Sequence, residues 1–290
     1  MNTVKTSPMR VTVIVPAHNR LDHTLACLAS LQAVTYPQMA VIVVDDGSSD
    51  GTAAAVTATF PQTTVLGGDG SLWWTGAVNK GIQYALTHGC EAVCLVNNDN
   101  TFAADFLSRL VACMRESSAD AVCARVIDRT NGRIFFAGGI FHPWRGLRMR
   151  RTEPGKDTRE ENEIAWCGGM GLLISADALR SYGAFDERTF PHYYADADFC
   201  LRLRKRGGRL VYCPHALVLN DTQSSGVSHR SGRFADLAAT LFSRRSHLNL
   251  AATWRFYRRH RPLLLPLVLP GRLLRVCGGF VLHRLYRRRR

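Results

Sequence analysis

Acidic and amide side chains follow two apolar, β-branched runs in the first hundred residues. Asp45 and Asp46 come directly after residues 40–44, and residues 97–99 (Asn-Asn-Asp) follow residues 92–96. One explanation of the first pair is a turn that caps the next helix. The other is a binding site, because two adjacent carboxylates repel one another unless a bound group, such as a base or ribose, donates hydrogen bonds to them. The carboxylate of the second cluster either belongs to a turn or reaches a divalent ion that bridges two phosphates, because Mg²⁺ takes oxygen ligands and few protein carboxylates. We interpret both clusters as functional.

A second acidic pair, Asp196 and Asp198, follows the aromatic stretch 191–194 (Pro-His-Tyr-Tyr) at the predicted start of a helix. Acids in the first turn of a helix compensate its dipole, and this effect alone is one explanation for one of the two acids. A general base needs a carboxylate near an acceptor hydroxyl. We therefore predict Asp196 as a general base, with Asp198 supporting it or the fold.

Two glycine-rich stretches carry tryptophan. Residues 67–76 contain Asp69, Trp73 and Trp74, and residues 166–170 read Trp-Cys-Gly-Gly-Met. Neither is a common phosphate-loop pattern. The paired tryptophans either pack in the core or offer a stacking surface to a base or sugar. Glycine lets the backbone approach a ligand closely, so we expect Gly168 and Gly169 on a substrate-facing strand.

The elements that position these residues alternate between strand and helix. Apolar runs predict strands, and leucine or alanine at helical spacing predicts helices. The predicted strands cover residues 11–16, 40–44, 64–66 and 92–96, and the predicted helices cover residues 21–31, 53–60 and 77–87. This alternation is typical of an α/β fold with a parallel or mixed sheet. The polar clusters fall just after strand ends, the edge where such sheets bind ligands.

The second half of the chain is less regular. Residues 128–162 are weakly periodic, with a predicted hairpin at 134–141. An apolar strand at 164–175, helices at 176–182 and 196–207, and a final strand at 209–213 complete the expected domain. We predict a catalytic domain over residues 1–230 and a basic, partly helical extension over residues 231–290.

The 290 residues carry 37 Lys and Arg against 23 Asp and Glu, a net charge of +14 that concentrates beyond residue 230. Such an excess favours a polyanionic partner. In the extension arginines alternate with apolar residues, which suits either a segment lying on an anionic membrane or a helical cap packed on the catalytic domain. Because the acids lie at the strand ends and the charge lies in the tail, we expect no nucleic-acid partner.

The nine cysteines form no Cys-x-x-Cys pair, which indicates free thiols in a reducing compartment. The first ten residues lack the apolar stretch of a signal peptide. The most apolar C-terminal run, residues 262–270, is shorter than the roughly 20 residues of a spanning helix, and Arg272 and Arg275 interrupt its extension. These features predict a cytoplasmic protein without a transmembrane segment, peripheral on the inner face of the cell membrane if the tail binds lipid.

Six stretches together resemble the inverting family 2 glycosyltransferases, in the branch similar to bacterial rhamnosyltransferases. They are residues 13–20, 44–52, 68–81, 95–99, 166–175 and 185–202, which lie in the family's order within residues 11–222. The resemblance implies a GT-A fold, a nucleoside-diphosphate sugar donor and inversion by a single displacement. It further implies a saccharide or lipid-linked saccharide acceptor and a role in cell-surface polysaccharide synthesis.

The resemblance assigns roles by position. Pro16, His18 and Asn19 would line the nucleotide pocket, and Asp45 and Asp46 would hold the base and ribose. Asp99 stands where the last acid of the family's metal motif stands, which implies Mg²⁺ or Mn²⁺, and Asp196 stands where the base stands. The remaining residues assigned to the nucleotide-sugar site are Asp69, Trp74, Asn79, Asn98, Gly168 and Gly169.

The sequence departs from the family at three positions. Asn97 replaces the first acid of the metal motif, which implies weaker metal binding. Ala195 replaces the acid that commonly precedes the base, which leaves both Asp196 and Asp198 as candidates for the base. A histidine expected after the last strand is absent near Asn220, where Asp221 or His215 is the candidate substitute. Rival interpretations are a sugar-phosphate nucleotidyltransferase, a non-enzymatic nucleic-acid or polyanion binder, and a catalytically inactive relative.

Overall fold

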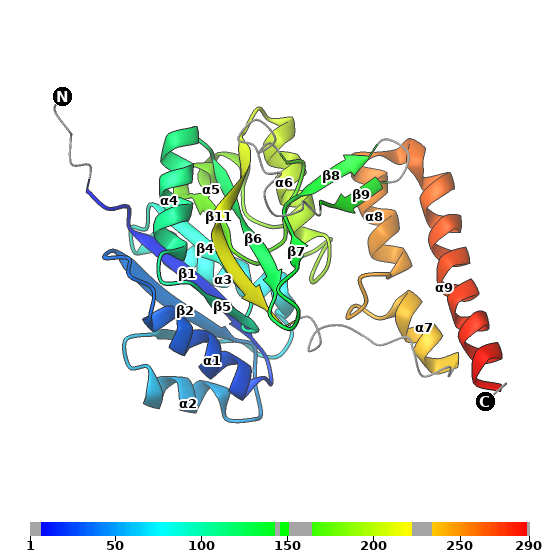
Figure 1. Cartoon of the computed structure of the whole chain (residues 1–290), viewed down its shortest axis with the longest axis horizontal. Helices are drawn as coiled ribbons and strands as arrows, with labels where there is room; N and C mark the ends of the chain where they lie inside the picture. Colours follow the sequence, from blue (N-terminus) through cyan, green and yellow to red (C-terminus); the bar gives the residue numbers. More distant parts are fainter. Residues whose placement is uncertain (1–6, 143–145, 151–163, 222–233, 289–290) are drawn as a thin grey trace.

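The computed structural model describes residues 7–142, 146–150, 164–221 and 234–288, with side chains up to residue 281. This part of the chain forms one mixed sheet of nine strands, in the order β3-β2-β1-β4-β10-β6-β11-β5, with β7 paired to β6. A separate pair, β8 and β9, forms a small antiparallel sheet. The architecture confirms the predicted α/β fold (Figure 1).

The longest strands are β1, β2, β6 and β11. Their bounds are β1 Val11–Ala17, β2 Met39–Asp45, β3 Thr64–Gly67, β4 Ala92–Leu95, β5 Asn100–Phe102, β6 Ala121–Asp128, β7 Ile134–Phe136, β8 Gly139–His142, β9 Gly146–Met149, β10 Leu172–Ser175 and β11 Leu210–Asn220. β1 pairs in parallel with both β2 and β4, and β6 pairs in parallel with β11. β10 runs antiparallel between β4 and β6, so those two parallel groups point the same way.

Helices cover the sheet and continue into the C-terminal extension. They are α1 Leu21–Gln32, α2 Thr52–Thr59, α3 Trp73–Thr87, α4 Phe106–Ser117, α5 Ala176–Tyr182, α6 Ala195–Lys205, α7 Phe234–Phe242, α8 Leu250–His260, the short 3-10 helix η2 Pro262–Leu264, and α9 Leu265–Arg288. In α1 the buried residues Thr24, Cys27, Leu28 and Leu31 recur at helical spacing, which turns one face toward the sheet.

The core lies between the central strands and the helices on either side. Val13, Ile14 and Val15 of β1 are wholly buried, as expected for a parallel strand covered on both faces. The β-branched runs that predicted strands in the sequence therefore form the centre of the sheet.

Several local predictions need correction. The paired tryptophans start α3 rather than lying in a loop before a helix at residue 77, because Asp46 binds the amides of this turn. The predicted hairpin at 134–141 is divided: β7 adds to β6, whereas the hairpin proper is β8 with β9. Of the strand predicted at 164–175, only β10 pairs regularly, and the final strand continues to Asn220 instead of ending at residue 213.

The C-terminal extension has one part that packs on the catalytic body and one that is largely exposed. Phe256 and Tyr257 of α8 are buried in the main core, and the Tyr257 hydroxyl accepts a 3.0 Å hydrogen bond from the Leu147 amide of β9. Figure 1 shows α7, α8 and α9 at one end of the molecule, with β8 and β9 beside α8. The predicted boundary at residue 230 falls outside the described residues, so the domain division stays a prediction.

The helix α9 is longer than the sequence analysis expected. It runs through Pro270, and within the described residues the segment Pro262–Val281 is long and apolar enough to cross a membrane, with 11% of it buried. The expectation that the apolar segment ends near residue 270 is wrong, because Arg272 and Arg275 do not interrupt the helix.

Candidate active site

Four predicted groups, together with Asn220, meet at one edge of the sheet. β1, β2, β4, β6 and β11 are parallel, so their carboxyl ends share that edge. The edge therefore collects His18 and Asn19 after β1, the two acids at the end of β2, residues 97–99 after β4 and Asn220 of β11. β10 is antiparallel, so the glycines that precede it reach the same edge from the opposite direction.

The turn after β1 is tied to the turn after β2. The Nδ1 atom of His18 lies 2.6 Å from the Asp46 carbonyl oxygen, and the Asn19 amide donates to the Ser48 hydroxyl at 2.8 Å. The side-chain oxygen of Asn19 accepts from the Ser49 amide at 2.7 Å. Pro16 is the penultimate residue of β1, and it pairs with Val44. These contacts fix the two loops against each other at the predicted nucleotide pocket.

The carboxylates of Asp45 and Asp46 are both buried, but they have different partners. Asp45 accepts a hydrogen bond from the Ser48 hydroxyl. Asp46 accepts from the amides of Gly70 at 2.9 Å, Leu72 at 3.2 Å and Trp73 at 2.9 Å. Asp46 therefore holds the glycine-rich turn at the start of α3, and its predicted contact with a base or ribose stays a prediction.

Three other predicted site residues are engaged locally. Asp69 accepts hydrogen bonds from the hydroxyl and amide of Ser71, and these lower the pKa of Asp69. The amide group of Asn79 donates to the Phe185 carbonyl and accepts from the Phe185 amide. Asn98 is buried, with its Nδ2 atom 3.0 Å from the Thr24 hydroxyl of α1. Asn79 and Asn98 thus brace the site in this structure.

Asp99 has a charge environment that suits a cation. Its side chain is 6% exposed, and it forms an ion pair with Arg20 at 3.5 Å. Burial raises the pKa of Asp99, Arg20 opposes that rise, and the negative charge of Asp221 adds to it. Asp221 therefore lies close enough to act on Asp99, whereas His215 is exposed further back on β11. Among the described residues no group of three acidic, histidine or cysteine side chains forms a metal cluster.

The amides around Asp99 form a connected layer at this edge. Asn100 donates to Asp99 at 3.4 Å and to Asn220 at 3.2 Å, and its side-chain oxygen accepts from the Asn97 amide at 2.9 Å. Asn97 in turn accepts a 3.1 Å hydrogen bond from the indole of Trp74. Sequence reasoning missed Arg20, Asn100 and Asn220 as members of this layer. Only Arg20 had a signal, since it closes the first stretch shared with the family.

Trp74 and the two glycines surround the predicted base. A Cβ atom on Gly169 would lie 2.2 Å from the indole of Trp74, and one on Gly168 would lie 3.5 Å from the Asp196 carboxylate. The absence of side chains at these positions lets the backbone pass between the indole and the acid. Trp74, Gly168, Gly169 and Asp196 are therefore brought together as predicted.

Asp196 is an isolated carboxylate. It is partly buried, and within the described residues it forms no ion pair. Burial raises the pKa of Asp196 to about 6, although the backbone amides of Ala197 and Gly169 act in the opposite direction. A carboxylate with a pKa near the working pH, beside a glycine that leaves no side chain in front of it, is suited to accept a proton.

Asp198, two residues further on, is wholly buried and fully paired. It binds Arg202 at 2.8 Å, Arg259 at 2.9 Å and His260 at 2.8 Å. Burial works to raise the pKa of Asp198, but these hydrogen bonds outweigh it and the pKa is lowered. Because Arg259 and His260 belong to α8, Asp198 joins the catalytic helix α6 to the extension. We therefore assign it a structural role.

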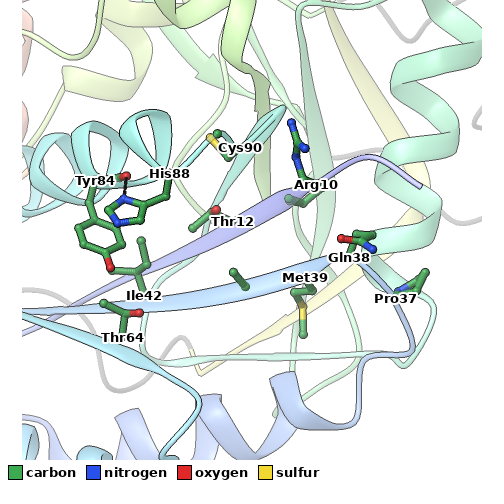
Figure 2. A pocket seen from close by; sticks show the side chains of 14 residues that line it. Arg10, Thr12, Pro37, Gln38, Met39, Ile42, Thr64, Tyr84, His88 and Cys90 are labelled. Carbon is green, nitrogen blue, oxygen red and sulfur yellow. Dashed lines mark hydrogen bonds between the residues drawn. The ribbon is translucent and has the colours of Figure 1, made fainter. Parts of the chain in front are cut away.

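A separate hollow of about 250 Å³ lies near the amino ends of β1 and β2, at the edge opposite the predicted site. Figure 2 shows Tyr84 and His88 of α3 on one side of it and Arg10 on another. None of the predicted site residues lines it. We therefore place the chemistry at the carboxyl edge, where the acidic and amide groups converge.

The fold and this edge define a class: an α/β protein whose acidic and amide side chains gather at the carboxyl ends of its parallel strands, the edge where open α/β sheets bind ligands. The family model for glycosyl transferase family 2 matches residues 12–183. The chain belongs to glycosyl transferase family 2 and is a glycosyltransferase.

Relatives and solved structures agree with this assignment. The N-acetylglucosaminyl-diphospho-decaprenol L-rhamnosyltransferase of Mycobacterium tuberculosis is 28% identical in an alignment that covers 76% of this chain and 77% of that protein. The undecaprenyl-phosphate mannosyltransferase of Micrococcus luteus is 26% identical over 85% of this chain and 96% of its own. A mannosyltransferase from Pyrobaculum calidifontis, solved with GDP-Man and Mn²⁺, has the same fold, with a TM-score of 0.62, 20% identity and coverage of 94% of this chain and 74% of its own.

Proposed function

We propose that this glycosyltransferase moves a sugar, with inversion, from a nucleoside-diphosphate sugar to a lipid-linked saccharide in cell-surface polysaccharide synthesis. The observation that carries the mechanism is the isolated Asp196 carboxylate, whose pKa burial raises to about 6. It lies beside Gly168 at the carboxyl edge of the sheet, and the neighbouring Gly169 packs on Trp74. The two bacterial relatives, whose names contain diphospho-decaprenol and undecaprenyl-phosphate, support the choice of acceptor class.

In this mechanism Asp196 removes the proton from the acceptor hydroxyl as that oxygen attacks the anomeric carbon. The bond to the donor diphosphate breaks on the opposite face, so a single displacement inverts the configuration. Trp74 and the backbone at Gly168 and Gly169 form the wall along which the donor sugar lies. The bracing of Asn79 against Phe185 holds α3 at a fixed distance from the segment that leads to Asp196.

We also infer that Asp99 holds a divalent ion, Mg²⁺ or Mn²⁺, with Asp221 as the second carboxylate. The buried charge of Asp99 and its raised pKa support this inference, as does the Mn²⁺ in the structural relative. When bound, such an ion would neutralise charge on the departing diphosphate. The residues present fit the ion because Mg²⁺ commonly takes only one or two protein carboxylates.

The extension supports a peripheral location on the inner face of the cell membrane. Crossing the bilayer with Pro262–Val281 would place Arg272 and Arg275 in the hydrocarbon, at a cost of roughly 2.5–3.5 kcal/mol for each arginine near the centre. Lying at the interface leaves the Arg275 guanidinium in the headgroup layer, where it contributes about 1 kcal/mol on an anionic surface, and Arg272 keeps its hydrogen bonds to the His247 carbonyl and the Thr253 hydroxyl. We therefore favour an interfacial helix.

A screen of nucleotide sugars tests the proposed function. The full-length protein is incubated with nucleotide-activated rhamnose, mannose, glucose or N-acetylglucosamine and a polyprenyl-diphosphate saccharide, with and without Mg²⁺ or Mn²⁺. We expect release of nucleoside diphosphate and an inverted glycosidic product for one donor, and neither from Asp196→Asn. No turnover with any donor, or a product that retains the anomeric configuration, would contradict the proposal.

A further inference from the structure

The loop between α7 and α8 brings two arginines to the rim of the active site. Arg244 and Arg245 are exposed, and the guanidinium carbon of Arg244 lies 5.8 Å from the ring centroid of Trp73. Trp73 is the first residue of α3, directly before Trp74 of the predicted donor wall. A segment of the extension therefore lies against the catalytic body at the site itself.

Three aromatic side chains, Trp73, His192 and Tyr193, continue this rim, and we call them the aromatic wall. The rings of Trp73 and His192 are 5.8 Å apart, and those of His192 and Tyr193 are 4.6 Å apart. Burial, followed by the charge of Asp196, raises the pKa of Tyr193, so this phenol lies near the predicted base. The wall therefore connects the arginine pair at one end with Asp196 at the other.

Two features of the wall indicate that it binds something. The Nδ1 atom of His192 is buried and has no hydrogen-bond partner in the described residues, which is costly for a polar atom. Burial, with the charge of Arg245, lowers the pKa of His192 to about 4, so the ring is neutral at physiological pH and can exchange a hydrogen bond with a hydroxyl. Trp73 has a positive φ of 56°, an unfavourable conformation for a bulky residue that recurs at ligand-binding sites.

In the described part of the chain no carboxylate lies within ion-pair distance of Arg244 or Arg245. The guanidinium group is planar and binds phosphate oxygens through two parallel hydrogen bonds. Two exposed guanidinium groups therefore lie next to the aromatic wall, in which His192 Nδ1 lacks a hydrogen-bond partner. This arrangement fits a ligand with phosphate at one end and sugar at the other.

We propose that Arg244 and Arg245 bind the diphosphate of a lipid-diphosphate saccharide acceptor, whose sugar lies along the aromatic wall with its reacting hydroxyl at Asp196. This inference rests on the proposed function and adds the residues that select the acceptor. The donor diphosphate is assigned to the other side of Trp74, near Asp99. The lipid chain would then leave the site on the side of α7 and α9, where Phe242 and Leu267 are exposed.

A pair of matched acceptors tests the inference. One carries a saccharide on an alkyl diphosphate and the other carries the same saccharide on the same alkyl chain without phosphate. For Arg244→Ala/Arg245→Ala we expect KM for the diphosphate acceptor to rise by about ten- to a hundredfold, the usual scale for losing charge-assisted hydrogen bonds. KM for the neutral acceptor, KM for the donor and hydrolysis of the donor by water should not change.

Arg255→Ala is the matched control, because Arg255 is an exposed arginine of α8 outside the aromatic wall. Arg244→Lys/Arg245→Lys should restore only part of the affinity, because lysine keeps the charge but loses the planar fork. His192→Phe should raise KM for both acceptors, since it removes the partner of a sugar hydroxyl.

The outcomes separate this inference from the proposed function. If the wild-type protein neither hydrolyses donor nor glycosylates either acceptor, the proposed function fails. The arginines do not bind the acceptor diphosphate if the wild type is active but the double variant raises KM for both acceptors equally, or raises KM for the donor. If Arg255→Ala has the same effect as the double variant, general attraction to anionic ligands or vesicles replaces the specific site.

Discussion

Asp196 and Asp198 are two residues apart on one helix, yet their carboxylates have opposite environments. Asp198 is satisfied by two arginines and a histidine, whereas Asp196 accepts only backbone hydrogen bonds and has its pKa raised to about 6. The chemistry follows from this difference, because a paired, buried carboxylate with a lowered pKa is a poor proton acceptor. Asp196 is the residue that remains available to an acceptor hydroxyl.

The pH dependence of transfer should report Asp196. Since the base must be ionised, kcat/KM should fall as the pH is lowered through about 6. Asp196→Asn should reduce the rate by ~10²–10⁴ and abolish this acid limb while donor binding persists. Steady-state kinetics from about one pH unit below this pKa to about two units above it measure the acid limb. Calorimetry measures the affinity for the donor. Near-normal turnover of Asp196→Asn would exclude it as the base.

The same substitution should stabilise the fold at neutral pH. The pKa of Asp196 is higher in the folded protein, about 6, than its ordinary value of 3.8. The ionised form is therefore disfavoured in the folded state, and this cost develops as the pH rises from about 4 to 6. Asp196→Asn should raise the free energy of unfolding at pH 7 by up to about 3 kcal/mol, a difference that vanishes below pH 4. Urea unfolding at pH 7 and pH 4 tests this, and a less stable variant at pH 7 contradicts it.

Asp99→Ala should weaken donor binding and remove the stimulation by added Mg²⁺ or Mn²⁺. The reason is that Asp99 supplies the buried charge proposed to hold the ion. Titration of the nucleotide sugar with and without metal measures the change, and Asp105→Ala, an exposed acid at the start of α4, is the control. Activity of the wild type that survives a strong chelator would remove the metal from the mechanism.

At the scale of elements, α6 and α8 are joined by a buried ionic cluster. Asp198 receives Arg259 and His260 from α8, and Arg259 also binds Asp186 at 2.7 Å. α8 further contributes Phe256 and Tyr257 to the core. The helix that carries the base is therefore held partly by the C-terminal extension.

Removing the Asp198 carboxylate should weaken the contact between α6 and α8. Asp198→Ala leaves Arg202, Arg259 and His260 without their shared partner, and removing one side of a buried ion pair typically lowers the free energy of unfolding by about 3–5 kcal/mol. Thermal unfolding should show a large fall in Tm, whereas Asp177→Ala, which breaks an exposed pair with Arg180, should have little effect. If both variants unfold at the wild-type temperature, the cluster does not hold α8.

At the scale of the whole molecule, the extension combines a packed helix with an exposed one. Exposed apolar residues of α7 and α9 lie in the same part of the chain that carries the positive charge; they include Phe234, Phe242, Leu267, Leu273 and Leu274. Apolar surface and arginine together favour an anionic membrane interface. The catalytic body would then work next to the lipid that carries its acceptor.

Deleting residues 265–290 should release the protein from anionic liposomes while hydrolysis of soluble donor persists. Leu264, which belongs to the core, is retained in this truncation. Sedimentation with anionic and neutral vesicles measures the effect, and an alkaline carbonate wash of cell membranes distinguishes a peripheral helix, which it extracts, from a spanning one, which it does not. If truncated and full-length proteins sediment equally, the membrane interpretation fails.

The sequence by itself determined the parallel half of the sheet, from β1 to β4, and the positions of its polar edge. Uninterrupted β-branched runs at β1, β2 and β4 admit few alternatives to buried strands, and the acids directly after them must lie at the carboxyl edge once those strands are parallel. The six stretches indicated the family because they occur along this chain in the same order as in the family.

Only the tertiary structure decided which residue does what at that edge. Two of the three partners of Asp198, Arg259 and His260, come from α8, at least 61 residues along the chain, and only the pair with Arg202 is local. The turn at Trp73 depends on amides that bind Asp46, and the contact between Arg244 and Trp73 joins segments at opposite ends of the sequence. Charge pairing and ring packing act through space, and their effects on pKa and access appear only when the chain has folded.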